Sequence, residues 1–164
     1  MSRLREAYAR YITGLNAIQP LFLLGVRAYW GYQFAATGWG KLTHLGGVTD
    51  FFTSLGIPFA GANAALVGST ELLGGIALLV GFGGRIAALP LVITMLTAYA
   101  TAHRPELLGV LSNPDGFLSA TPFLFLLASL TVLVFGPGKL SLDALVFRPR
   151  QRVPSGDATL VAAK

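Results

Sequence analysis

The chain has 164 residues, of which 54% are hydrophobic and only 12% are charged. Its mean hydropathy of +0.66 is too high for a water-soluble domain, whose surface needs more charge. The net charge is +5, but the charged residues avoid four long apolar stretches. This pattern predicts an integral membrane protein and excludes nucleic acid as a partner, because no dense basic patch is interleaved with aromatic residues. The chain has no cysteine, which excludes disulfides, thiolate metal sites and iron-sulfur clusters.

The first two apolar stretches each contain a single charged residue. A helix that crosses a hydrocarbon core of about 30 Å needs roughly 20 mostly apolar residues. Residues 21–37 approach this length, with Pro20 expected in the first helical turn and Arg27 as the charged residue. Residues 63–80 also approach it, with Glu71 as the charged residue and a cluster of glycines as the expected stop.

Two further stretches complete a pattern of four helices. Residues 86–102 contain no charged residue, and Pro90 is expected to bend this helix near its start. Residues 117–137 contain no charge either, and the glycines around Pro137 should end the helix sharply. A short interfacial helix is expected over residues 48–55. The sequence therefore predicts an all-α fold, a transmembrane four-helix bundle with an amphipathic N-terminal segment.

The two ends of the chain differ in composition from its centre. Residues 1–19 predict an amphipathic cytoplasmic lead-in that lies along the membrane surface. Apolar residues recur there at helical spacing beside three arginines: Leu4, Ala7, Tyr8, Tyr11, Ile12 and Leu15. Residues 20–147 form the predicted membrane domain, and the polar residues 148–164 are expected to form a flexible cytoplasmic tail.

The distribution of positive residues predicts the orientation. With four spans, the two termini and the loop around Arg85 share one side, which collects nine lysines and arginines. The opposite side has two, Lys41 and Arg104. Because positive residues concentrate on the cytoplasmic side, both termini are expected in the cytoplasm of a bacterium or archaeon, with the chain in the cytoplasmic membrane.

Arg27 and Glu71 are the charged residues expected inside the bilayer. An isolated charge there costs about 2.5–3.5 kcal/mol on insertion scales, so each needs a partner. Counted from the predicted helix ends, their backbones lie at depths of roughly 9 and 14 Å, a difference that an arginine side chain spans. We therefore predict an interhelical ion pair, with Gln33, Tyr29 or Tyr32 forming hydrogen bonds nearby. Two roles remain open, a structural clamp or a polar site that holds a ligand or relays a proton.

A second polar set is predicted toward the outer end of the bundle. Lys41 lies fourteen residues after Arg27 on almost the same helical face, and small residues between them leave room. His103 follows the third apolar stretch on the same side, with His44 and Asp50 in the neighbouring loop. These residues either line the mouth of a pocket or anchor their helices in the headgroups. No metal site is expected, and the candidate ligand-binding residues are Arg27, Lys41, Glu71, His103, Trp30 and Gln33.

Several short motifs occur in a characteristic order within residues 20–147. They are Arg27 with Phe34, Gly38, Lys41 and Leu42; Gly46-Gly47; Ser54-Leu55-Gly56-Ile57-Pro58; Glu71-Leu72-Leu73-Gly74-Gly75 with Leu78 to Gly81; and Gly136-Pro137-Gly138-Lys139-Leu140-Ser141-Leu142-Asp143. In this order they resemble the DoxX family of small four-helix membrane proteins. Many members carry a histidine where this chain has Thr37, so no role of that histidine carries over.

The resemblance implies a four-helix bundle that supports quinone-linked redox processes as a small subunit or partner of a membrane oxidoreductase complex. No intrinsic cofactor is expected, but a quinone is a candidate ligand, with Lys41 or Arg27 bonding its carbonyl and Glu71 assisting with its proton. Electrons have to come from a partner, because the chain lacks cysteine and flavin motifs. The alternative is a non-enzymatic membrane scaffold or assembly factor that recruits partner proteins or lipid. Small-molecule transport is less favoured, because it calls for a homo-oligomer of so small a bundle.

Overall fold

The computed structural model describes residues 2–146, which form helices and no strand. The four long helices are α1 (Ser2–Thr43), α3 (Ala60–Val80), α4 (Gly84–Ala100) and α7 (Pro122–Phe135). The short helices are α2 (Leu45–Ser54), α5 (Arg104–Leu108), α6 (Pro114–Ser119) and α8 (Leu142–Val146). The predicted all-α fold class is confirmed.

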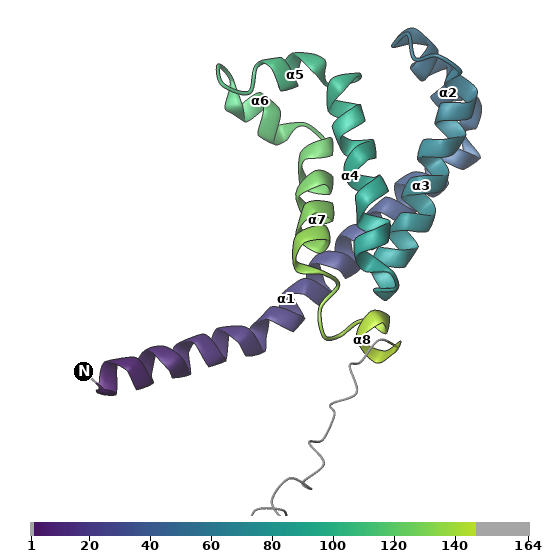
Figure 1. Ribbon diagram of the computed structural model, residues 1–164. Coiled ribbons are helices and arrows are strands. Elements are labelled where there is room, and N and C mark those ends of the chain that lie inside the picture. Colours follow the sequence, from purple (N-terminus) through teal and green to yellow (C-terminus); the bar gives the residue numbers. More distant parts are fainter. Residues whose placement is uncertain (1, 147–164) are drawn as a thin grey trace, which may run out of the picture.

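The long helices form two pairs, α1 with α3 and α4 with α7. The pairs lie close together where α3 turns into α4, and they diverge toward the end that carries α2, α5 and α6 (Figure 1). Buried apolar side chains from all four long helices form one core, which includes Phe34, Leu78, Leu91, Met95, Tyr99, Leu126 and Val132. A cavity lies between the two pairs and is lined in part by the core residue Met95.

Helices α1 and α3 approach so closely that their contact requires glycine. A Cβ atom on Gly31 would lie 2.7 Å from the backbone nitrogen of Leu79, and a Cβ on Gly38 would overlap the backbone of Leu72. Glycine lets two helix backbones come into direct contact. The contacts also fix the register, since Gly31 lies level with Gly75 to Leu79 and Gly38 lies level with Leu72.

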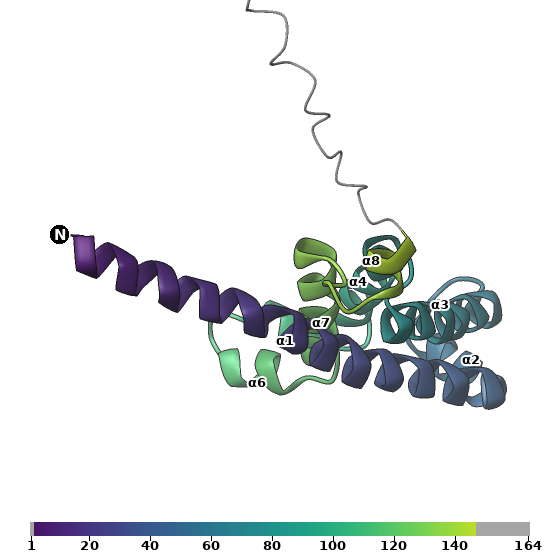
Figure 2. The same ribbon diagram turned by 90° about the horizontal axis from the view of Figure 1, so that it is seen from below.

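Helix α1 is much longer than the predicted first span. It continues unbroken through Pro20 for 42 residues, roughly 63 Å at 1.5 Å per residue, about twice the thickness of a hydrocarbon core. The expected helix start at Pro20 is therefore wrong, because residues 2–19 belong to the same helix. This N-terminal part extends sideways, away from the other helices (Figures 1 and 2).

Glycines end the helices where the sequence predicts. Helix α3 stops at Gly81 with φ 72°, and α7 stops at Gly136 with φ 79°. Glycine occupies this left-handed region without the steric penalty that a Cβ brings. The short helix α2 is also confirmed, with a turn at Gly56 (φ 71°). The fourth long helix, α7, lies within the predicted window of residues 117–137 and begins at Pro122.

In the described part of the chain, α3 is the helix that is long and apolar enough to cross a membrane by length and composition, with 21 residues and a mean hydropathy of 1.5. Helices α4 and α7 are apolar but shorter, with 17 and 14 residues. The number of long helices agrees with the predicted bundle. Four membrane crossings remain a prediction.

The segment after α7 packs against the turn between α3 and α4. Its Asp143 carboxylate accepts hydrogen bonds from the backbone nitrogens of Gly83 (2.7 Å) and Gly84 (3.0 Å) at the start of α4. The backbone nitrogen of Asp143 in turn donates to the carbonyl oxygen of Gly81 at 3.0 Å. The first N–H groups of α4 are thereby satisfied by a negative charge, which helix N-termini favour.

The predicted tail over residues 148–164 lies outside the described residues.

Candidate functional site

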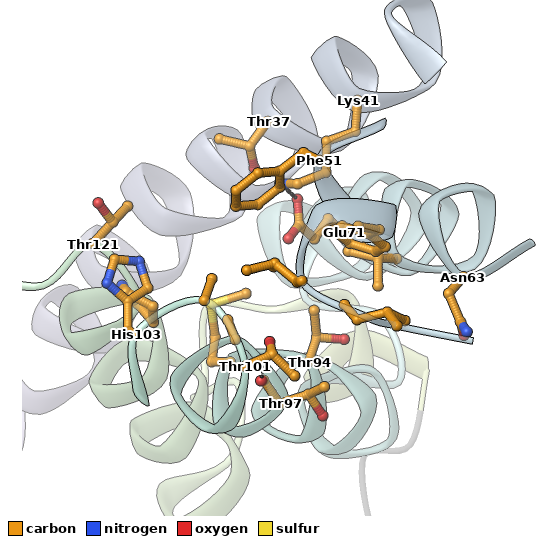
Figure 3. A pocket seen from close by; sticks show the side chains of 18 of the residues that line it. Thr37, Lys41, Phe51, Asn63, Glu71, Thr94, Thr97, Thr101, His103 and Thr121 are labelled. Atoms are coloured by element: carbon orange, nitrogen blue, oxygen red, sulfur yellow. Dashed lines mark hydrogen bonds and ion pairs between the residues drawn. The ribbon is translucent and has the colours of Figure 1, made fainter. Parts of the chain in front are cut away.

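A cavity of about 530 Å³ lies between the two diverging helix pairs. Helices α1, α2, α3, α4 and the start of α7 all contribute to its wall (Figure 3). Most of the wall is apolar and includes Phe51, Phe52, Leu55, Ile57, Val67, Met95 and Phe125. This size and lining are typical of a site for a small apolar molecule.

An ion pair between Lys41 and Glu71 lies in the wall of the cavity (Figure 3). The Lys41 Nζ atom is 2.5 Å from Glu71 Oε2, and the two side chains are 30% and 3% exposed. The close contact at Gly38 brings the last turns of α1 beside the middle of α3, which places the two charges together. Each charge compensates the burial of the other, and Lys41 keeps access to the cavity.

The predicted ion pair between Arg27 and Glu71 is wrong. Glu71 lies level with Gly38, which is eleven residues from Arg27 along α1, or roughly 16 Å at 1.5 Å per residue. An arginine side chain cannot span this distance. The estimate of depth failed because it counted from Leu21 as the end of the helix, whereas α1 continues past it to Ser2.

Arg27 lies instead beside the C-terminal end of α3, at the level of Gly81. It is 3% exposed, and its guanidinium donates a hydrogen bond to the carbonyl oxygen of Leu140 in the segment before α8. Its Nε and Nη1 atoms are buried without a hydrogen-bond partner among the described residues. Arg27 therefore joins α1 to the C-terminal segment and lies outside the cavity.

Substitution of Gly81 tests how tightly Arg27 is packed. A Cβ on Gly81 would overlap the Arg27 guanidinium, whereas a Cβ on Gly83 would meet nothing within 4 Å. Both glycines have positive φ, 72° and 57°, so alanine costs about 1–2 kcal/mol of backbone strain at either position. We expect Gly81→Ala to lower the apparent melting temperature in detergent clearly more than Gly83→Ala. Equal losses would show that Arg27 adapts freely.

The remaining sequence candidates divide into two groups. His103 lines the cavity, with Nδ1 3.8 Å from Glu106 Oε1, whereas Trp30 and Gln33 do not line it. Trp30 packs edge-on against Phe125, with ring centroids 4.9 Å apart. Three of the six candidates, Lys41, Glu71 and His103, thus meet at one cavity.

Other predicted neighbours point away from the site. Tyr29 and Tyr32, expected to support an ion pair, are 58% and 62% exposed. His44 and Asp50 are also exposed and contribute nothing to the cavity wall. A second, more polar cavity of about 480 Å³ adjoins the first and shares His103 and Thr121 with it. His103 therefore lies between an apolar space and a polar one.

Sequence analysis did not assign several residues that line the cavity. These are Thr37, the aromatic residues of α2, Thr94 and Thr97 of α4, and Thr101 directly after α4. The hydroxyls of the latter three threonines donate to carbonyl oxygens of α4, so these O–H groups are not free to donate to a ligand. The helical spacing of these threonines was the available signal.

The fold and the site together define a small helical protein with a buried ion pair beside an apolar cavity. The chain belongs to the DoxX family, whose model matches residues 22–104. The resemblance found in the sequence is thereby confirmed over the first three long helices.

Two relatives align with this chain over almost their full length. "Putative oxidoreductase CatD" of Bacillus subtilis (strain 168) is 27% identical over 137 residues, which is 84% of this chain and 96% of the relative. "Inner membrane protein YqjF" of Escherichia coli (strain K12) is 32% identical over 135 residues, 80% of this chain and 97% of the relative. No solved structure matches the chain significantly. The family and these relatives indicate that the chain is a membrane protein.

Proposed function

We propose that the chain crosses the cytoplasmic membrane four times, with both termini in the cytoplasm, and binds a quinone in the cavity in support of a membrane oxidoreductase. The observation that carries this proposal is the Lys41–Glu71 ion pair in the wall of an otherwise largely apolar cavity. The charge bias of the loops supports the orientation. A relative named an oxidoreductase supports the class of process.

The chemistry of the wall fits a quinone head group. The apolar side chains accommodate a flat ring, whose two carbonyl oxygens are hydrogen-bond acceptors. The Lys41 ammonium has three N–H donors, of which the bond to Glu71 uses one, so the others are available to a carbonyl. The pair has no net charge, which suits a neutral ligand better than an anion.

Reduction of a quinone to a quinol takes two electrons and two protons. The electrons come from a redox centre of the partner oxidoreductase, and the protons enter through side chains of this chain. Because Glu71 is ionised in its pair with Lys41, it first accepts a proton that enters by way of the cavity and then passes it to a carbonyl oxygen that Lys41 holds. Two such transfers supply the two protons. His103 lines both cavities and directly precedes α5, at the end of the bundle that the charge bias places outside.

Photolabelling tests whether the cavity binds a quinone. Purified protein in detergent is illuminated with an azido derivative of a short-chain ubiquinone, and labelled peptides are identified by mass spectrometry. We expect label on α2 and α4 that excess decylubiquinone prevents. Lys41→Met should lower the affinity roughly tenfold or more, because a hydrogen bond from a charged donor contributes about 1.5–3 kcal/mol. Lys139→Met, an exposed lysine outside the cavity, is the matched control.

The opposite result identifies the alternative class of function. Label that is absent, or that distributes over lipid-facing residues and resists competition, contradicts quinone binding. Co-purification of partner proteins without any extractable quinone then favours a scaffold or assembly factor. Mass spectrometry of molecules extracted from the same preparation provides this comparison.

A further inference from the structure

The N-terminal part of α1, Ser2 to Pro20, has no partner helix among residues 2–146. Arg27 is already level with Gly81, just past the end of α3, so the residues before it extend beyond the α1–α3 contact. Residues 3–19 are exposed except for the half-buried Ile12. Figures 1 and 2 show this part leaving the bundle sideways. At 1.5 Å per residue it is roughly 28 Å long, a substantial unpartnered surface.

Residues 2–20, here called the overhang, carry a stripe of large apolar side chains on one face. Its members recur at spacings of four and three residues, which places them on one side of a helix. Their exposed fractions lie between 46% and 79%, for Leu4, Tyr8, Tyr11, Leu15 and Ile18. A continuous exposed stripe of this kind indicates an interaction surface.

The charged residues of the overhang are ordered around this stripe. At about 100° per residue, Arg5 lies on one border of the stripe, and Arg3 and Arg10 lie on the other. Glu6 lies on the opposite face. Cations on both borders and an acid facing away suit a helix that lies in the headgroup layer, because the arginines then reach lipid phosphates while the stripe enters the acyl boundary.

We infer that residues 2–20 form a surface helix that binds anionic lipid headgroups of the cytoplasmic leaflet. This surface is independent of any ligand in the cavity and so goes beyond the proposed function, while the choice of the cytoplasmic leaflet rests on the proposed orientation. A second copy of the chain is the other candidate occupant, since the same spacing occurs in coiled coils. No residue beside the stripe is acidic; these residues are Arg3, Arg5, Ala7, Arg10, Ile12, Gly14 and Gln19. A second copy therefore offers the arginines no counter-charge, whereas an anionic membrane does.

Because the chain has no cysteine, a single introduced cysteine can be labelled specifically. Tyr11→Cys places a nitroxide label on the stripe, and Thr13→Cys places one on the opposite face as the matched control. The full chain is reconstituted in nanodiscs of phosphatidylcholine alone or mixed with phosphatidylglycerol. The accessibility of each label to oxygen, which enters lipid, and to a water-soluble nickel chelate is measured.

We expect the label at position 11 to become accessible to oxygen and protected from nickel when phosphatidylglycerol is present. The label at position 13 should stay accessible to nickel in both lipids. Arg3→Gln, Arg5→Gln and Arg10→Gln combined should weaken surface binding roughly a hundredfold, at about tenfold or less for each arginine. High salt should reverse the protection in the chain without arginine substitutions, because it screens exposed charges.

Three outcomes would overturn the inference. Equal nickel accessibility at positions 11 and 13 in both lipids would mean that the stripe stays in water. Equal protection in phosphatidylcholine alone would remove the role of the arginines. Spin–spin broadening at position 11 in both lipids would show that a second copy covers the stripe.

Discussion

Gly38→Leu is expected to disrupt the α1–α3 pair, while Gly40→Leu on the same helix leaves it intact. A side chain at Gly38 collides with the backbone of Leu72, which cannot move without separating the helices, whereas a Cβ at Gly40 meets nothing within 4 Å. Overpacking of this kind costs about 1–3 kcal/mol or more. Leucine at Gly40 instead gains up to about 1 kcal/mol of helix propensity.

Thermal unfolding in detergent, followed by circular dichroism, measures both variants. The Gly38 variant should aggregate during purification or melt well below the unsubstituted protein. The Gly40 variant should melt at the same temperature or slightly higher. Similar melting of the two variants would show that α1 and α3 are not in backbone contact.

The second large effect is expected at the ion pair, and it is asymmetric. Lys41→Met leaves the Glu71 carboxylate, which is 3% exposed, without its counter-charge. Loss of one partner of a buried pair costs about 3–5 kcal/mol. Glu71→Gln should cost less, because Lys41 is 30% exposed and can turn its ammonium toward the cavity. The double variant should regain much of the stability lost in Lys41→Met.

The double variant also separates the two roles that the sequence left open for a buried pair. Recovered stability with lost quinone photolabelling would show that the charges serve the ligand. Recovered stability with unchanged labelling would reduce the pair to a structural clamp and contradict the proposed mechanism. Purely additive losses in the double variant would mean that the two charges do not interact.

The sequence predicted the helical class and the number of long helices, because apolar length and glycine stops are local signals, but it did not predict the short helices α5, α6 and α8. Gly81 and Gly136 end their helices as expected, and the short helix before Gly56 is present. The start of α1 was misplaced because proline is favoured in a first helical turn, whereas Pro20 lies inside a long continuous helix. The fourth helix lies within its predicted window, but the sequence did not fix its first residue, because the apolar residues before Pro122 are equally compatible with a turn.

The site was predicted in its residue types but not in its pairing. Lys41, Glu71 and His103 do surround one cavity, yet Glu71 meets Lys41 rather than Arg27. Partner choice depends on the register between two helices, and that register is set by backbone contacts at Gly31 and Gly38. A count of residues from assumed helix ends contains no information about such contacts.

The two facing walls of the cavity belong to different helix pairs, which meet at the turn from Gly81 to Gly84. The Asp143 carboxylate and the Arg27 guanidinium both hold the C-terminal segment against this turn. These contacts fix the angle at which α3 and α4 leave the turn. A small change in the angle between α3 and α4 at the turn produces a larger change in the distance between these helices at the cavity. The width of the cavity, and hence the size of the ligand that it admits, therefore depends on residues that do not line the cavity.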